Sequence, residues 1–303
     1  MSNLFLGIDT SNYTSSFCLV DEQGKKQMEI KKPLTVKEGR LGLRQQEAVF
    51  QHVRNMETVA TQLNGISGVI RGVSSSVSPR KVEGSYMPVF VVSRMLGKLI
   101  AGLLHVTYTE TSHQRGHIRA GMEDLDPIGD SFTAFHLSGG TTEALRVDVL
   151  AETGAFNEKM VFESSDISIG QLIDRIGVYL GKPFPSGPAL EAMLPKERGR
   201  EAFDKRHYKA FFREGQLNLS GLETYLKKQL DQKEDPQKVV FLLFENIIQL
   251  LEKMIDEITE QKEEDVLFTG GVSSNEYIRS RLSELYKNKK ANLYFCKKEN
   301  CTD

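Results

Sequence analysis

The fold of this chain is decided by residues 132–149, FTAFHLSGGTTEALRVDV. An apolar run of strand length (132–137) is followed by a turn of small polar residues (138–142), and then by a second strand-like run. The beginning of the chain repeats this order, because the apolar run 4–9 is followed by the small polar turn 10–15 and the strand-like run 16–20. The sequence therefore predicts two hairpins of one kind, one near the start of each half of the chain.

Two such hairpins indicate a duplicated core. Two lobes that each begin with strand, small polar turn and strand are typical of a duplicated ribonuclease-H-like fold, as in the group of actin, heat-shock-70 and sugar kinases (ASKHA). In that α/β architecture the two turns face each other across a cleft and hold nucleotide phosphates, because exposed backbone N–H groups and hydroxyls suit anionic oxygens. The alternative is that the chain contains two ordinary, unrelated hairpins.

A third turn of small residues lies near the end of the chain. A strand expected over 265–268 is followed by the turn 269–275, which contains Gly270 and Gly271, and then by a helix over 276–286. Glycine lets a ring approach the backbone, and an asparagine can read ribose hydroxyls or a base. We therefore expect a nucleoside at this turn, with Asn275 as one contact.

The length of 303 residues allows two hydrophobic cores, since single cores stop growing at about 250–300 residues. Strand and helix alternate over the first hundred residues, as in an α/β lobe. We expect an N-terminal ribonuclease-H-like lobe over residues 1–110 and a C-terminal lobe over 111–303. The second lobe is expected to carry a helical insertion over about 165–260.

Composition narrows the class of protein. Hydrophobic residues make up 39% and charged residues 26%, as in an average globular protein. The net charge of −2 argues against a broadly basic protein that coats nucleic acid, but it leaves room for tRNA bound by a local patch. Three cysteines without a Cys-x-x-Cys motif fit a reducing cytoplasm. No signal peptide is visible, and Arg94 and Lys98 interrupt the most apolar stretch, so we expect no membrane association.

His113 and His117 are the first candidates for a metal site. Their i, i+4 spacing places both imidazoles on one face of a helical turn, and imidazole is a common ligand of zinc, iron and nickel. Two histidines lack the third protein ligand that a catalytic metal site normally has, and Gly116 weakens the helix. From these residues alone, a solvated turn that carries two histidines stays the alternative to a metal site.

Seven motifs in this order resemble the tRNA threonylcarbamoyladenosine transferase family, formerly called the O-sialoglycoprotein endopeptidase or glycoprotease family. The resemblance covers nearly the whole chain. The motifs are His113-Gln114-Arg115-Gly116-His117, Leu137-Ser138-Gly139-Gly140-Thr141-Thr142, Gly170-Gln171-Leu172-Ile173-Asp174, Pro185-Ser186-Gly187-Pro188, Leu219-Ser220-Gly221-Leu222, Gly270-Gly271-Val272-Ser273-Ser274-Asn275 and Cys301-Thr302-Asp303.

The resemblance implies a function and a set of site residues. Proteins of this family transfer a threonylcarbamoyl group from threonylcarbamoyl-adenylate to the adenosine next to the anticodon of tRNA. It also implies one divalent metal (iron, zinc or magnesium), ATP or threonylcarbamoyl-adenylate as ligand, and small protein partners, including an inactive paralogue that forms a heterodimer. The implied metal ligands are His113, His117 and Asp303. The implied nucleotide contacts are Leu137, Ser138, Gly139, Gly140, Thr141, Asp174, Gly187 and Asn275; no catalytic residue is assigned.

The chain departs from the family pattern near the reacting centre. Asn12, Tyr13 and Thr14 stand where relatives usually have Cys-Asp-Glu, and Thr141 stands where they have histidine. Two hypotheses follow: an active transferase, or a divergent paralogue that binds nucleotide and metal in a regulatory role or in a different carbamoyl transfer. A sugar kinase or heat-shock-like ATPase shares the fold only, because a metal held by two histidines is not expected there.

Overall fold

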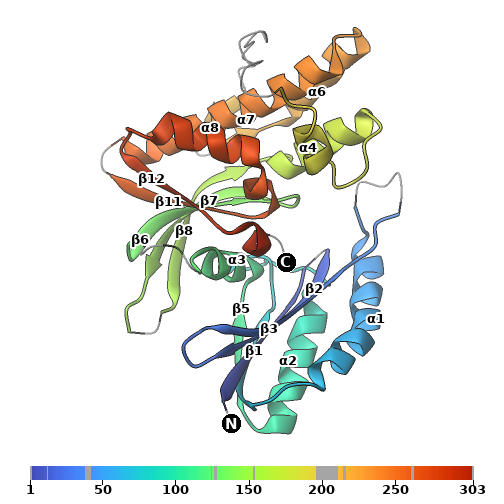
Figure 1. Ribbon diagram of the computed structural model, residues 1–303, viewed down its shortest axis with the longest axis vertical. Helices are drawn as coiled ribbons and strands as arrows, with labels where there is room; N and C mark the ends of the chain where they lie inside the picture. The colour runs from blue at the N-terminus through green and yellow to red at the C-terminus, as the bar shows by residue number, and fades with distance from the viewer. Residues whose placement is uncertain are drawn as a thin grey trace. The chain divides into compact units, whose positions relative to one another are not determined.

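The computed structural model describes residues 2–11, 13–37, 42–123, 125, 128–152, 154–195, 211–213, 216–260 and 263–301. The chain divides into two compact units, Met1–Gly116 and His117–Thr302, and the division falls within helix α3 (His113–Gly121). Each unit is built around one β-sheet, coloured blue to cyan in the first unit and green to red in the second (Figure 1).

The first unit has a five-stranded sheet in the order β3-β2-β1-β4-β5. β1 pairs antiparallel with β2, and β2 with β3, whereas β4 runs parallel to both β1 and β5. Burial alternates along β1, where Leu4, Leu6 and Ile8 all point into the core. The five strands are β1 (Asn3–Thr10), β2 (Thr14–Asp21), β3 (Lys26–Pro33), β4 (Val69–Ser76) and β5 (Thr107–Thr111).

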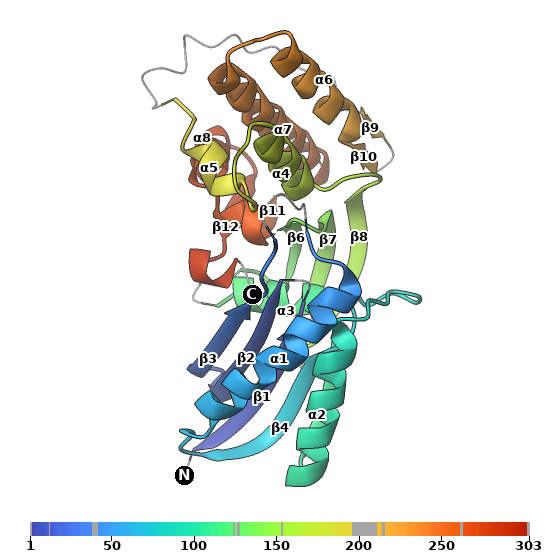
Figure 2. The ribbon, with the colours of Figure 1, turned by 90° about the vertical axis from the view of Figure 1, so that its right-hand side faces the viewer.

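Two helices cover one face of this sheet, α1 (Gln45–Leu63) and α2 (Phe90–Leu104) (Figure 2). Val59 of α1 and Ala101 of α2 belong to the same buried cluster as Leu6 of β1. The remaining buried residues of that cluster come from β1, β2, β3 and β4, so the core of the first unit lies between the sheet and the two helices.

The second unit has a seven-stranded sheet in the order β12-β11-β6-β7-β8-β10-β9. β6, β7 and β8 form an antiparallel meander, and β11 runs parallel to both β6 and β12. Its strands are β6 (Ser131–Leu137), β7 (Thr142–Val149), β8 (Phe156–Ser164), β9 (Phe211–Arg213), β10 (Gln216–Asn218), β11 (Glu264–Thr269) and β12 (Ala291–Phe295).

The two sheets share one strand order. In the first unit the sequence order of strands is 3-2-1-4-5; in the second, β8-β7-β6-β11-β12 repeats it with the same parallel and antiparallel pairs. A meander followed by two parallel strands is the ribonuclease-H-like arrangement expected from the repeated hairpins. The prediction of a duplicated α/β core is therefore confirmed.

Helices cover the second sheet as well. On one face, Phe135 and Leu137 of β6 belong to a large core that includes residues of several helices. On the other face, Phe132 and Ala134 pack with Ile118 of α3. The helices that lie between β8 and β11 in the chain are α4 (Ile169–Tyr179), α5 (Gly187–Glu191), α6 (Ser220–Asp231) and α7 (Pro236–Thr259). After β11 come the short 3-10 helix η2 (Gly271–Ser274), α8 (Glu276–Tyr286) and, beyond β12, η3 (Lys298–Asn300).

Candidate functional site

The turn between β6 and β7 is closed by its own serine. The N–H of Ser138 donates to the carbonyl oxygen of Thr141 over 2.9 Å. The Ser138 hydroxyl oxygen accepts hydrogen bonds from the backbone N–H groups of Gly140 (3.2 Å) and Thr141 (3.0 Å). Residues 137–141, which were all expected to contact the nucleotide, therefore form one compact loop that its own hydrogen bonds stabilise. We call it the SGGT loop.

The N-terminus of α4 packs directly on the SGGT loop. Ser168 caps the helix, because its hydroxyl oxygen accepts from the N–H of Gln171 (3.0 Å), and it donates to the carbonyl of Gly139 (3.1 Å). The N–H of Ile169 donates to the Thr142 hydroxyl over 2.7 Å. Gly170 has no room for a side chain, since a Cβ there would lie 2.4 Å from the carbonyl oxygen of Ser138. The positive end of a helix and a loop of small residues thus meet, as in an anion-binding site.

The third turn lies against the same loop. Gly270 adopts a φ of 87°, and a Cβ at this position would lie 2.5 Å from the carbonyl oxygen of Leu137. Glycine is therefore required both by the backbone conformation and by the close approach. Asn275, at the end of the turn, caps α8 through a hydrogen bond from the N–H of Ile278 to its side-chain oxygen (2.9 Å). The structure thus brings the expected nucleoside turn to the SGGT loop.

Farther along α4, Asp174 contacts the residue just before Gly187. The carboxylate of Asp174 accepts a hydrogen bond from the N–H of Ser186 over 2.7 Å, and Ser186 directly precedes Gly187, the first residue of α5. Burial raises the pKa of Asp174, and the hydrogen bond from Ser186 only partly offsets that rise. A carboxylate held at an energetic cost inside the fold is a feature of binding sites as well as of structural caps.

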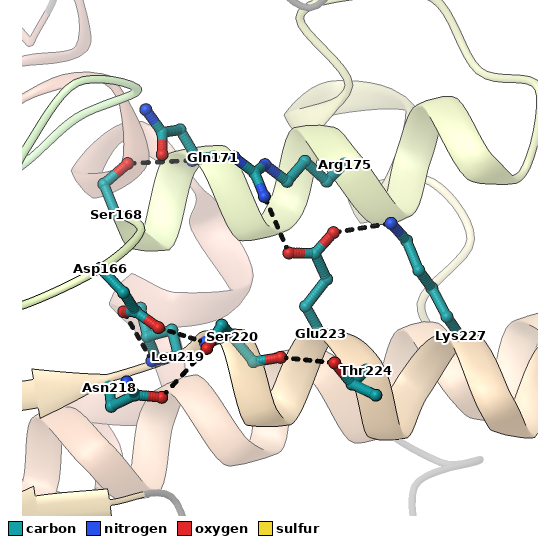
Figure 3. Close-up of polar contacts among 10 residues, drawn as sticks. All are labelled: Asp166, Ser168, Gln171, Arg175, Asn218, Leu219, Ser220, Glu223, Thr224 and Lys227. Carbon is teal, nitrogen blue, oxygen red and sulfur yellow. Dashed lines mark hydrogen bonds and ion pairs between the residues drawn. The ribbon is translucent and has the colours of Figure 1, made fainter.

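A supporting network fixes the other side of α4 (Figure 3). The two carboxylate oxygens of Asp166 accept from the N–H groups of Leu219 (2.9 Å) and Ser220 (2.7 Å), where α6 begins. Burial raises the pKa of Asp166, but these hydrogen bonds outweigh it and leave the pKa below its ordinary value. Glu223 of α6 then bridges Arg175 of α4 (3.0 Å) and Lys227 (2.6 Å). Sequence reasoning did not single out Asp166 and placed it at the start of a helix over 166–180, whereas α4 begins at Ile169.

The two candidate metal-binding histidines lie on α3. His113 begins the helix, and its Nδ1 lies 3.0 Å from an oxygen of Asp9 at the end of β1. The other oxygen of Asp9 is buried and has no hydrogen-bond partner among the described residues. His117 is 9% exposed, and the centre of its ring lies 4.7 Å from that of His136. Asp303, the third expected ligand, lies outside the described residues.

These residues fit a metal by their chemistry. Two imidazoles and a carboxylate form a donor set used for iron and zinc. A carboxylate on the second ring nitrogen of a ligating histidine is the usual way to orient such a ligand, and Asp9 supplies it to His113. Among the described residues, no group of three or more His, Cys, Asp or Glu side chains is arranged to hold a metal ion. Sequence reasoning missed Asp9, although its position just before the first polar turn was a signal.

The turn between β1 and β2 is held by other contacts than those of the SGGT loop. Asn12 lies outside the described residues, Tyr13 is 37% exposed and Thr14 is buried at the start of β2. The hydroxyl of Ser15 lies 2.8 Å from Nδ1 of His52, whose Nε2 lies 2.6 Å from the carbonyl oxygen of Ser11. Because a carbonyl can only accept, Nε2 carries the proton and Nδ1 accepts from Ser15. Burial lowers the pKa of His52 and favours this neutral form.

The duplicated core, the SGGT loop and the glycine turn beside it define a protein of the ASKHA class.

Solved structures agree on this fold. HypF in its phosphate- and nucleotide-bound form is 12% identical with a TM-score of 0.63 over 99% of this chain. Component A of (R)-2-hydroxyglutaryl-CoA dehydratase from Acidaminococcus fermentans is 13% identical with a TM-score of 0.57, covering 99% of this chain and 94% of that one. A glucokinase of the ROK family from Streptomyces griseus is 10% identical with a TM-score of 0.53, covering 97% of this chain and 94% of that one. This chain spans 53% of the HypF chain.

Within that class, residues 84–303 match the tRNA N6-adenosine threonylcarbamoyltransferase (TsaD) family. The chain belongs to this family, whose members are transferases that modify tRNA. None of the helices in the described part of the chain is long and apolar enough to cross a membrane.

Proposed function

We propose that this protein transfers a threonylcarbamoyl group from threonylcarbamoyl-adenylate to the exocyclic amine of the adenosine next to the anticodon in tRNA. The observation that carries the proposal is the close packing of the α4 N-terminus and the Gly270 turn on the SGGT loop. That arrangement suits the phosphate and adenosine of an adenylate. Membership of the family supports tRNA as the substrate.

In the proposed reaction the adenosine amine attacks the carbonyl carbon of the carbamoyl group. A C–N bond forms, the bond between that carbon and the phosphate oxygen breaks, AMP leaves and the amine loses a proton. The SGGT loop lies at the positive end of the α4 helix dipole, which stabilises the negative charge that remains on the phosphate. Asp174, Gly187 and Asn275 bind the adenosine part of the adenylate, so that the carbonyl is kept in one orientation.

A single divalent metal ion, which would be iron, zinc or magnesium, would be held by His113, His117 and Asp303. When bound, such an ion polarises a phosphate or carbonyl oxygen as a Lewis acid. Asp9 contributes by fixing the ring of His113, since its carboxylate lies 3.0 Å from Nδ1. ATP is the expected alternative ligand of the same nucleotide site.

The test uses purified protein with its partner enzymes, unmodified tRNA and threonylcarbamoyl-adenylate. Digestion of the tRNA followed by mass spectrometry of the nucleosides detects threonylcarbamoyladenosine if the proposal is correct. A reaction that leaves unmodified adenosine, with intact adenylate still present, would refute it.

A second candidate function rests on the substituted turns. Tyr13 and Thr14 carry no carboxylate, and Thr141 carries no imidazole, where relatives have acidic residues and histidine. A paralogue that binds nucleotide and metal as a regulatory subunit, or that carries out a different carbamoyl transfer, would explain these changes. In that case the parent is inactive, and restoring Cys, Asp, Glu and His at positions 12, 13, 14 and 141 creates the activity. An active parent excludes this candidate.

An apolar stripe on α2 supports a protein partner. Four large side chains recur every four residues along the outer face of the helix, and all are exposed: Val91 (49%), Met95 (55%), Leu99 (55%) and Leu103 (71%). Spacing of four residues places them in one row about 18 Å long, and exposed apolar rows of this kind mark interaction sites. We propose that the row packs against an apolar helix face of a paralogous chain, the partner that the family resemblance implies.

A further inference from the structure

Two cysteines lie together at the C-terminal side of the second sheet. Cys296 directly follows β12, and Cys301 directly follows η3. Both are fully buried, at 0% exposure, and their sulfur atoms are 2.6 Å apart. The sulfurs of a disulfide are about 2.05 Å apart, so the two thiols need only a small movement to bond.

The backbone holds the pair in this place independently of the sulfurs. The N–H of Cys296 donates to the carbonyl of Phe268 in β11 over 3.1 Å. The N–H of Cys301 donates to the carbonyl of Lys298 over 3.3 Å, which closes the turn of η3. The strand end and the turn therefore fix the two Cα positions.

Side chains from the neighbouring elements complete the cluster. Arg279 of α8 donates to the carbonyl oxygen of Cys296 (2.6 Å) and to the sulfur of Cys301 (3.2 Å), so a single guanidinium contacts both cysteines. The Ser273 hydroxyl lies 3.8 Å from one sulfur and 3.6 Å from the other. A pair of thiols held by a cation and a hydroxyl is arranged for reaction with each other.

We propose that Cys296 and Cys301 are a modification site, at which hydrogen peroxide forms an intramolecular disulfide. One thiol attacks peroxide, the O–O bond breaks, and a sulfenic acid and water form. The second thiol then attacks the sulfenic sulfur, the S–S bond forms, and a second water leaves. In total, two thiols and one peroxide give one disulfide and two waters. Hydrogen peroxide is the oxidant of the proposal because both cysteines are buried and it is a small, uncharged molecule.

The disulfide closes a ring over residues 296–301 and restrains the turn of η3. Asn300 in this turn donates to the carbonyl of Ala120 and to the carboxylate of Glu123, both at 3.3 Å. The bond therefore reduces local opening of a segment that ends two residues before Asp303. Hydrogen exchange of the backbone amides at 297–301 is expected to slow on oxidation and to recover when a dithiol reductant is added.

The test exposes the full-length protein to hydrogen peroxide, blocks remaining thiols in denaturant and digests it with trypsin. Because Lys297 and Lys298 lie between the two cysteines, the disulfide joins two peptides that trypsin otherwise separates. The expected product is this linked pair of peptides. Its mass is the sum of the two reduced peptides less two hydrogen atoms, and it disappears on reduction. It should persist in Cys18→Ser, the matched control, and vanish in Cys301→Ser.

Complete alkylation of both Cys296 and Cys301 after peroxide treatment would overturn the proposal, as would linkage of either one to Cys18. The linked peptide is measured in the parent protein, so the outcome holds even if Cys301→Ser folds poorly. No step of the test uses tRNA transfer, and its result is therefore independent of the proposed function.

Discussion

Gly170→Ala probes the contact on which the nucleotide site depends. The new Cβ would lie 2.4 Å from the carbonyl oxygen of Ser138 and 2.7 Å from the backbone of Gly139. Ordinary contacts begin at 3.4 Å, so the α4 N-terminus must move by about 1 Å away from a backbone that cannot bend aside. Overpacking of this kind costs about 1–3 kcal/mol in the free energy of unfolding.

The same shift should weaken nucleotide binding. The N–H groups at a helix N-terminus contribute up to about 2 kcal/mol to a bound anion, so we expect the Kd for ATP in isothermal titration to rise by about 5- to 30-fold. Urea unfolding measures the stability change. Gly102→Ala in α2 is the matched control, because a Cβ there meets nothing within 4 Å and should stabilise the protein by about 0.5–1 kcal/mol. A Gly170→Ala protein with unchanged stability and unchanged Kd would show that the α4 N-terminus need not lie so close to Ser138.

Three further changes test other parts of the account. Burial raises the pKa of Asp174, so its ionised form is less favourable in the folded protein than in the unfolded chain. Ionised Asp174 therefore lowers the free energy of unfolding at pH values above the raised pKa. Asp174→Asn should therefore be more stable than the parent at neutral pH, with a difference that disappears in acid; urea unfolding against pH checks this, and a gap that widens in acid contradicts it. Asp9→Asn should weaken metal binding by about 10- to 100-fold, as measured by metal content after dialysis, whereas an unchanged content would remove Asp9 from its positioning role. Leu99→Glu should abolish heterodimer formation in sedimentation, whereas Leu150→Glu, at a leucine of the second unit with a similar exposed fraction, should not.

Much of the fold could be predicted because local pattern and final structure agree. The hairpin around the SGGT loop, the strand at β11 and the helix α8 begin and end within a residue or two of their expected positions. Apolar runs of strand length and small polar turns are sufficient signals for such elements. The repeated hairpin also predicted the duplicated core, because two segments with the same pattern of strands and turns are expected to form the same arrangement of strands.

The site was predicted less fully, because its supports depend on long-range packing. Gly170 looks like any helical glycine in the sequence, and its contact with Ser138 exists only after α4 has docked on the loop. Asp9 and His113 are more than a hundred residues apart and meet only when β1 and α3 are in place. The pair of Cys296 and Cys301 was missed for a different reason: the two are only five residues apart, but their spacing matches no short cysteine motif.

Labelled adenylate allows the transfer reaction itself to be followed. Threonylcarbamoyl-adenylate labelled in its threonine portion is mixed with the protein, its partners and unmodified tRNA, and label in tRNA and free AMP are followed over time. We predict that label enters the tRNA in step with AMP release, and that both slow in Gly170→Ala. AMP release without label in the tRNA, or neither product above the rate without protein, would contradict the proposed transfer.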